Sequence, residues 1–259
     1  MDERKWNRDA WDRNVALGNR WTVPVEASVI QRARAGDWQV LLTSNTPVPR
    51  DWFPAMAGCR VLCLAGAGGQ QAPIMAAAGA CVTVLDNSPK QLEQDKFVAD
   101  REGLDIECIE GDMTDLSRFD DRSFGLIVHP CSNCFVRDVH AVWRESYRVL
   151  CNGGCLLSGV VNSLAFLFSD EDYESGNLTV TQPLPWYDAD HLDNPDVARR
   201  VAVGETLEFG HTLQDLVGGQ VKAGFSITGF YEDGFDPDSE VAIGRFSHWM
   251  IATRAVKRA

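Results

Sequence analysis

The sequence predicts an α/β fold with a doubly wound, mostly parallel sheet and helices on both faces. From residue 60 onward, apolar segments of strand length alternate with segments of helical pattern. Such alternation is typical of parallel strands joined by right-handed helical crossovers. The strand segments are continuous apolar runs, as expected of strands covered on both faces.

The core elements are predicted between residues 58 and 161. In order, they are a strand at 60–65, a helix at 70–79, strands at 81–86, 106–112, 124–130 and 155–161, and helices at 88–103 and 137–150. The helix at 88–103 has the clearest beginning, because Ser88 can cap it, Pro89 suits its first turn and Gln91 completes a capping box. Gly153 and Gly154 are expected to end the helix at 137–150.

The remaining segments flank this core within one predicted domain, 1–259. Residues 1–57 are tryptophan-rich and predict an N-terminal helical cap. Residues 162–205 are acidic and contain prolines, and we expect them to form an insertion over the substrate site. Residues 206–259 predict a helix near 212–224 and strands at 225–233 and 248–256.

Composition and charge narrow the possible partners. The 259 residues are 45% hydrophobic and 24% charged, as in an ordinary globular protein. The formal net charge of −13 repels phosphate backbones and anionic lipids, so no nucleic-acid or membrane partner is expected. The charged N-terminus does not resemble a signal peptide. We therefore expect a cytoplasmic protein with a small-molecule substrate, and its oligomeric state stays open.

The eight cysteines are expected to be reduced, because no export signal is visible. Cys131 and Cys134, together with Cys151 and Cys155, would supply the four ligands of a zinc site. The predicted topology places the two pairs at opposite ends of the sheet, so no metal site is predicted.

The stretch VLCLAGAGG, residues 61–69, carries a strand into a tight, glycine-rich turn. As a dinucleotide fingerprint it would place Gln71 where close helix packing needs a small residue, which disfavours a nicotinamide cofactor. The alternative is a tight turn that needs positive φ and binds nothing.

Two carboxylates at the following strand ends favour an adenosine-containing cofactor. Asp86 lies 20 residues after Gly66 (86 − 66) and is placed to accept hydrogen bonds from ribose hydroxyls. Asp112, with the N–H of Met113, is placed to bind an adenine edge. The alternatives are a helix cap for Asp86 and a turn residue for Asp112.

Taken together, residues 60–160 and 205–255 resemble the class I S-adenosylmethionine (SAM)-dependent methyltransferases, in the small-molecule branch often called the type 11 methyltransferase domain. The resemblance is carried by VLCLAGAGG, VTVLDNS, EGDMTDL, SFGLIVHP and YRVLCNGGCLLSG. It implies a Rossmann-like, seven-stranded sheet whose last strand is antiparallel and inserted beside the sixth, and SAM as cofactor. The implied cofactor-binding residues are Ala65, Gly66, Ala67, Gly69, Gln70, Asp86, Asn87, Ser88, Asp112, Met113 and His129.

The glycine-rich turn departs from the family pattern at three positions. Cys63 stands where an acidic residue is usual, and Ala65 and Ala67 stand where glycines are usual. We expect the alanines to be tolerated where φ is negative. Gln70, Gln71 or Asn133 would have to replace the missing acid as an anchor for the methionine amino group.

The catalytic candidates are two histidines. His129 ends the fourth predicted strand and is a candidate general base or contact of the methionine end, the alternative being a histidine bonded to backbone. His211, with Glu208, is a candidate for the substrate pocket, the alternative being that they fix the entry of the last helix.

The sequence thus predicts an enzyme that transfers a methyl group from SAM to a small molecule, by in-line displacement in an enclosed pocket. Trp6, Trp11 and Trp21 are candidates for an apolar lid. If the acidic side chains of the insertion face inward, they favour a neutral or cationic acceptor. The alternatives are a catalytically silent SAM-binding module and, less favoured, a nicotinamide-dependent oxidoreductase.

Overall fold

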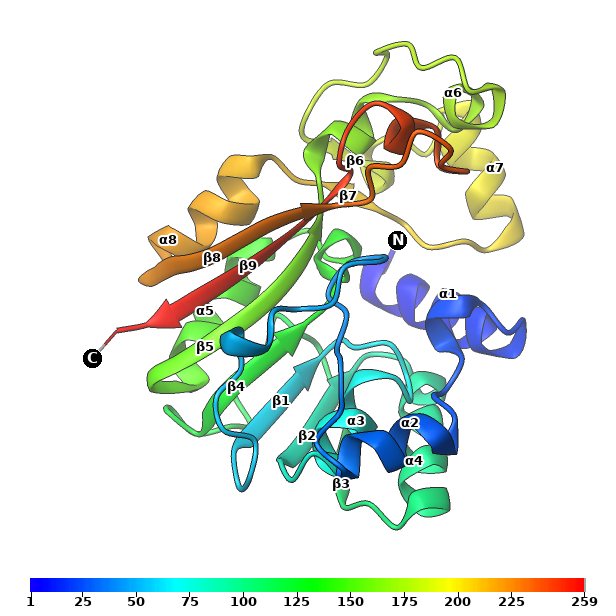
Figure 1. The fold of residues 1–259 in the computed structure, drawn as a ribbon. Coiled ribbons are helices and arrows are strands. Elements are labelled where there is room, and N and C mark those ends of the chain that lie inside the picture. Colours follow the sequence, from blue (N-terminus) through cyan, green and yellow to red (C-terminus); the bar gives the residue numbers. More distant parts are fainter. Residues whose placement is uncertain (259) are drawn as a thin grey trace.

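A seven-stranded sheet runs through residues 1–258, the part of the chain that the computed structural model describes (Figure 1). Its strand order is β3-β2-β1-β4-β5-β9-β8. The strands are β1 (Arg60–Leu64), β2 (Cys81–Asp86), β3 (Ile106–Glu110), β4 (Phe124–His129), β5 (Leu150–Val161), β8 (Phe225–Asp233) and β9 (Met250–Lys257).

The strand directions confirm the predicted fold class. β1 pairs in parallel with β2 and β4, β2 with β3, and β4 with β5. The last strand, β9, lies between β5 and β8 and is antiparallel to both. Parallel pairing brings the carboxyl ends of β1 to β4 to one edge of the sheet, where the residues that follow each strand meet.

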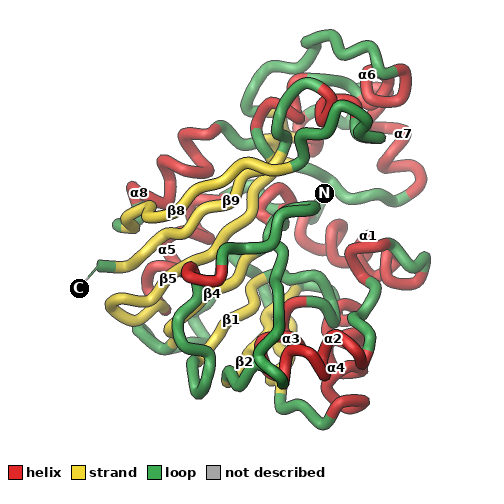
Figure 2. The backbone as a smooth tube through the Cα atoms, in the orientation of Figure 1, coloured by secondary structure: helices red, strands yellow, loops and turns green. Residues whose placement is uncertain are grey.

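Helices cover both faces of the sheet (Figure 2). The described helices are α1 (Glu3–Ala16), α2 (Ala27–Arg34), α3 (Gln71–Ala77), α4 (Pro89–Glu102), α5 (Val139–Val149), α6 (Asp170–Ser175), α7 (Pro195–Val203) and α8 (Gly219–Lys222). Alternate residues of β1 belong to different cores: Val61 packs with Ile30 of α2, whereas Leu62 packs with Trp143 of α5. This alternation is what a strand buried on both faces produces.

The predicted end of the helix at 137–150 and the predicted end of the third strand both differ from the structure. α5 ends at Val149 and β5 begins at Leu150, so Gly153 and Gly154 lie inside the strand and do not stop the helix. Gly153 has a φ of +79°, and the register between β4 and β5 shifts there. The glycine pair therefore accommodates an irregularity in the strand. β3 is also shorter than predicted, ending at Glu110.

The chain from 162 to 205 forms a lobe with α6 and α7 beyond the carboxyl edge of the sheet (Figure 1). In this lobe β6 (Trp186–Tyr187) pairs with β7 (Phe209–Gly210) in a short antiparallel ribbon. Within residues 1–258, the structure has no helix of the length and apolar character required to cross a membrane.

The Asp233 carboxylate, at the end of β8, holds the loop of residues 43–46, which precedes β1, by hydrogen bonds. It accepts hydrogen bonds from the Thr43 hydroxyl at 2.7 Å, the Asn45 N–H at 2.9 Å, and both the N–H and the hydroxyl of Thr46. Burial by itself would raise the pKa of Asp233, but these donors outweigh it and lower the pKa to about 2. The anion thus holds the segment whose neighbours, residues 41–43, border the cavity described below.

We predict that Asp233→Asn lowers the free energy of unfolding at pH 7 by about 2 kcal/mol, because several bonds to a charged acceptor are weakened or lost. The folded-state pKa is depressed, so the wild-type advantage is complete above about pH 4 and disappears as the pH falls towards 2. Urea unfolding at a series of pH values measures this. Asp238→Asn, which alters an exposed carboxylate of the following loop, is the control and should change little. A pH-independent difference would contradict the prediction.

Candidate functional site

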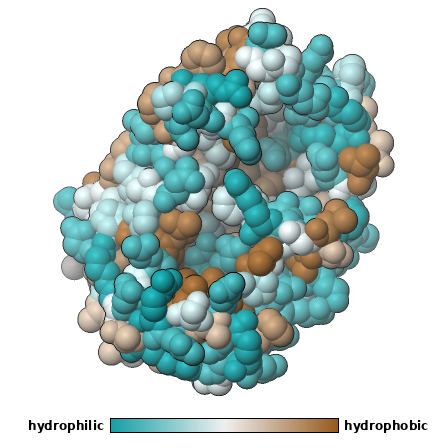
Figure 3. Space-filling view, turned by 45° about the vertical axis from the view of Figure 1, so that its right-hand side comes forward, coloured by the Kyte–Doolittle hydropathy of each residue, from teal (hydrophilic) through white to brown (hydrophobic). Residues whose placement is uncertain are grey.

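A cavity of about 680 Å³ lies over the carboxyl edge of the parallel strands. Its walls come from the segments that follow β1, β2, β3 and β4, from α1, from residues 41–43 and from the 162–208 region. Figure 3 shows the surface hollowed between the lobe and the body of the sheet. Segments far apart in the sequence therefore share one enclosed space.

Most of the predicted cofactor-binding residues line this cavity. They are Ala65, Gly66, Ala67, Gln70, Asp86, Asn87, Asp112 and Met113. Gly69, Ser88, His129 and His211 are not among the lining residues. The structure thus brings the strand-end carboxylates together with the turn after β1, and places both histidines outside the wall.

The second half of the glycine-rich turn faces helix α4. The Gly68 N–H donates to Gln91 Oε1 at 2.9 Å, and the Gly69 N–H donates to Asp95 Oδ1 at 2.9 Å. A Cβ on Gly68 would lie 2.5 Å from the Gln91 carbonyl oxygen, so only glycine fits there. The predicted capping box is only half formed, because Ser88 accepts the Gln91 N–H while the Gln91 side chain holds the turn.

Ala65 adopts a left-handed backbone conformation, with φ at 47°. The condition of negative φ, under which alanine is tolerated in this turn, is thus not met at Ala65 but is met at Ala67. An L-residue with a Cβ is strained in this region by about 1–2 kcal/mol. The strain is located where the backbone leaves β1 and enters the cavity wall.

Asp86 presents a buried carboxylate at the end of β2. Burial raises the pKa of Asp86 to about 7, although the N–H groups of Ser88 and Asn87 oppose the shift. The Ser88 N–H donates to Asp86 Oδ1 at 2.8 Å. Ser88 itself is the N-cap of α4 and donates its hydroxyl to Asp12 of α1 at 2.6 Å, which is a structural role.

Asp112 combines the two roles considered for it. Its Oδ1 accepts both the N–H and the hydroxyl of Thr114 at 2.8 Å, as a turn residue does. The same side chain lines the cavity, and Arg4 of α1 lies 3.6 Å from its other oxygen.

His129 lies beneath the cavity with no exposed surface. Its Nδ1 donates to the Leu64 carbonyl at 2.8 Å, and its ring meets the edge of Trp143 with centroids 6.0 Å apart. Burial lowers the pKa of His129 to about 4. The geometry matches the alternative of a backbone-bonded core histidine.

His211 also serves the backbone. Its Nε2 donates to the carbonyl oxygen of Val136 at 3.0 Å and lies 3.3 Å from that of Asn133. Burial lowers the pKa of His211, so the ring is neutral at physiological pH. These bonds fix the loop that follows β4, on which Cys131 and Cys134 border the cavity.

Among the proposed replacements for the acid at Cys63, the two glutamines lie in the wall. Gln70 donates to the carbonyls of Arg20 and Val23, and Gln71 donates to that of Leu41. Asn133 is buried outside the cavity and donates to Gly159. Gln71, at the start of α3, is 7% exposed and borders the cavity.

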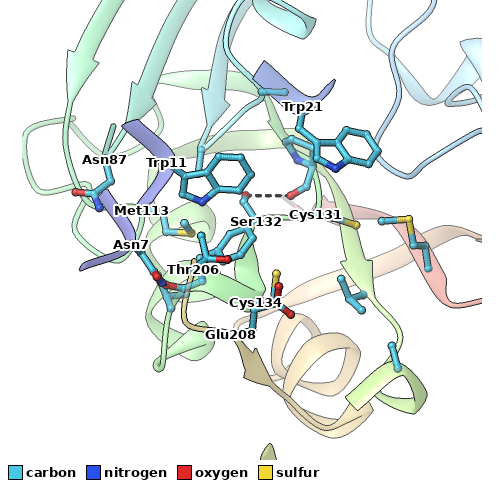
Figure 4. Close-up of a pocket in the computed structure, with 18 of the residues that line it drawn as sticks. Asn7, Trp11, Trp21, Asn87, Met113, Cys131, Ser132, Cys134, Thr206 and Glu208 are labelled. Carbon is cyan, nitrogen blue, oxygen red and sulfur yellow. Dashed lines mark hydrogen bonds between the residues drawn. The ribbon is translucent and has the colours of Figure 1, made fainter. Parts of the chain in front are cut away.

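Helix α1 closes the cavity from the N-terminal side, with Trp11 in the wall and Trp21 nearby (Figure 4). Asn7, only 3% exposed, attaches this helix to the loop after β4 and to the segment before β7. Its amide donates to the carbonyls of Phe135 and Leu207 at 3.0 Å, and its oxygen accepts the Leu207 N–H at 2.8 Å.

Trp6 does not line the cavity, because its indole N–H donates to the Glu205 carbonyl. Two of the three candidate lid tryptophans, Trp11 and Trp21, thus reach the cavity.

The far half of the cavity is aromatic and acidic. Its aromatic walls are Phe166, Phe168, Tyr173, Trp186 and Trp249. Arg200 Nη2 lies 2.9 Å from Asp188 Oδ1, and Arg200 Nε lies 3.0 Å from Asp170 Oδ2 without the alignment of a hydrogen bond. Asp170, Asp188, Arg200 and Glu208 all border the cavity.

Sequence reasoning missed several of these residues. No local motif marks Asn7, Asp95 or Arg200. The partner of Asp95 lies 26 positions away, that of Asn7 lies 200 away, and Arg200 pairs with Asp188 in a different element. Only Gln91 had a visible signal, and its position three residues after Ser88 favoured a local bond over the contact with Gly68 that the structure shows.

Comparisons with known proteins are consistent with this geometry. The profile of a methyltransferase domain matches residues 62–158. The chain is 49% identical over 253 residues to an uncharacterized methyltransferase, YbaJ, of Bacillus subtilis strain 168, and the match covers 97% of each chain.

Solved structures share the fold at low sequence identity. A SAM-dependent methyltransferase from Mesorhizobium loti superposes with a TM-score of 0.63 at 19% identity, covering 80% of this chain and 94% of that one. A SAM-dependent methyltransferase from Methanosarcina mazei gives a TM-score of 0.57 at 19% identity, covering 83% and 99%.

We predict that Ala65→Gly raises the free energy of unfolding by about 0.5–1 kcal/mol, because it removes a strained Cβ at positive φ. Ala67→Gly is the matched control and should lower stability by roughly 0.5–1 kcal/mol, since it only adds freedom to the unfolded chain. Denaturant unfolding of both variants measures the difference. Equal effects of the two substitutions would show that Ala65 is not strained.

We predict that Asn7→Ala lowers stability by about 2 kcal/mol, because it leaves buried backbone groups without partners. Limited proteolysis should then cleave faster within residues 1–24. Asn14→Ala, on the same helix and with no side-chain hydrogen bond in the described structure, is the control and should change stability by less than about 0.5 kcal/mol. Unchanged proteolysis of Asn7→Ala would rule out this closure of α1.

Proposed function

Because the chain belongs to the class I SAM-dependent methyltransferases, we propose that it transfers a methyl group from SAM to a small-molecule acceptor inside the cavity described above. The observation that carries the proposal is the single cavity of about 680 Å³, which joins the strand-end residues to an aromatic half. Such a volume lies within the range of small-molecule sites.

The near half of the cavity fits the cofactor. Asp86 offers a carboxylate to the ribose hydroxyls, with Asn87 beside it, and Asp112 and Met113 border the place of the adenine. The backbone from Ala65 to Ala67, with Gln70, would hold the methionine end. Gly69 and Ser88 contribute through the backbone geometry of the turn and of the helix cap, since neither lines the cavity.

Methyl transfer needs alignment and the exclusion of water more than it needs acid–base chemistry. When bound, SAM supplies a methyl group on a sulfonium, whose carbon–sulfur bond breaks in line with the attacking atom. The chain would hold the acceptor on the opposite side of the methyl group. Trp11 and the lobe of residues 162–205 would exclude water from that half.

The site gives no ground for a histidine base. His129 is buried away from the cavity with a lowered pKa, and His211 bonds backbone carbonyls. An acceptor atom that is neutral and already nucleophilic needs no base on the protein, whereas a poorly acidic hydroxyl does. We therefore propose catalysis mainly by positioning.

We predict that the protein binds SAM and does not bind NAD, and that Asp86→Ala weakens SAM binding about tenfold or more through lost hydrogen bonds to a charged acceptor. Isothermal calorimetry measures both. Asp100→Ala, an exposed carboxylate of α4, is the matched control and should bind as the wild type does. No binding of SAM at high micromolar concentration, or equal affinity in Asp86→Ala, would refute the assignment.

Turnover separates an enzyme from a silent SAM-binding module. The protein is incubated with methyl-labelled SAM and fractionated metabolite extracts, and label is expected in a small molecule. SAM binding without transfer to any fraction would favour the silent module. NAD binding in place of SAM would favour the oxidoreductase.

A further inference from the structure

Glu208 is an ionisable side chain of the far half that has no partner among the described residues. Its carboxylate makes no hydrogen bond or ion pair with any residue among 1–258, although it lines the cavity. Its backbone is held firmly, because the Glu208 N–H donates to Asp188 Oδ2 at 2.8 Å and its carbonyl accepts the Asp188 N–H at 3.0 Å. The backbone that carries this side chain is therefore fixed against Asp188.

Arg200, the cation that acts on Glu208, already pairs with other carboxylates. Arg200 is paired with Asp188 and lies against Asp170, so it cannot fully neutralise a third carboxylate. Glu205 adds another negative charge at the same wall. Arg199 pairs with Asp170, Glu174 and Asp196, and Arg137 is bound to Glu3 and Asp190. The described residues thus leave the acceptor half with an excess of negative charge.

Aromatic side chains line the half of the cavity that contains Glu208, and such side chains attract a positively charged nitrogen. Phe166, Phe168 and Trp186 line the same half of the cavity, and aromatic faces attract ammonium groups. The Glu208 carboxylate borders the cavity without a partner among residues 1–258, so a ligand cation held there could pair with it. An anionic acceptor would meet the same carboxylate with repulsion.

On the premise of the proposed function, we propose that the methyl acceptor carries a positively charged nitrogen and that Glu208 recognises it through an ion pair. Glu208 is then the residue that sets acceptor specificity, while the aromatic walls surround the ammonium group. Figure 4 shows Glu208 beside Cys134 at the wall of this cavity, with Trp11 from the opposite side. The ion pair would fix where the acceptor lies relative to the methyl group.

The charge state of Glu208 gives the inference a pH signature. Burial raises the pKa of Glu208 to about 7, opposed by Arg200 and reinforced by Asp188, Asp170 and Glu205. Tyr173 and Cys134 also face it, and burial raises the pKa of both well above neutrality. A cation should therefore bind more tightly as the pH rises through about 7.

The test uses three probes that share a benzene ring and differ in charge: benzyltrimethylammonium, benzyl alcohol and benzoate. Each is titrated by calorimetry into the full chain saturated with S-adenosylhomocysteine, which fills the cofactor half. We expect the ammonium to bind best and the benzoate worst. Ammonium affinity should increase from pH 6 to pH 8, and this probe has no titrating group of its own.

Glu208→Gln keeps the size of the side chain and removes its charge. It should weaken ammonium binding about tenfold or more and abolish the pH dependence, while S-adenosylhomocysteine binding persists. Glu171→Gln removes one charge from the exposed surface of α6, outside the cavity, and should shift ammonium affinity less than about twofold.

The inference is overturned if the wild type binds benzyl alcohol as well as the ammonium, or if Glu208→Gln retains wild-type affinity. The selectivity and pH profile of the wild type decide the matter even if Glu208→Gln does not fold. Failure of the wild type to bind S-adenosylhomocysteine would instead remove the proposed function, and with it this inference.

Discussion

The parallel register of β1, β2, β3 and β4 is the constraint on which the site depends. Because these strands all end at one edge, residues separated by dozens of positions meet there. The insertion of β9 between β5 and β8 widens the sheet without adding another parallel crossover. The half of the cavity next to β1, β2 and β3 follows from this topology. The few residues after each strand supply its polar groups.

The sequence was sufficient for whatever depended on local pattern. Alternating apolar segments predicted the sheet, and the spacing of Asp86 and Asp112 from the glycine-rich turn placed both carboxylates at the cavity. Ser88 was identified as a helix cap for the same reason. These features depend on strand ends and turns, which neighbouring residues specify.

What the sequence did not reveal depended on tertiary contacts. Whether His129 faces a cavity or a core is decided by which side of β4 the ring leaves, and Trp143 of α5 covers it. The Gln91 side chain was expected to bond back to Ser88, but its oxygen accepts the Gly68 N–H of the glycine-rich turn. The positive φ of Ala65 likewise follows from the path that β1 takes into the cavity wall, not from the preference of alanine.

The two halves of the cavity have one wall in common. Helix α1 contacts Ser88 near the turn after β1 through Asp12, and Leu207 in the far half through Asn7. The helix begins at Glu3, whereas the chain emerges from β9 at the opposite end of the sheet (Figure 1). A purification tag or fluorescent fusion placed before Met1 would crowd both halves at once, so the carboxyl terminus is the position for any handle used in assays of this protein.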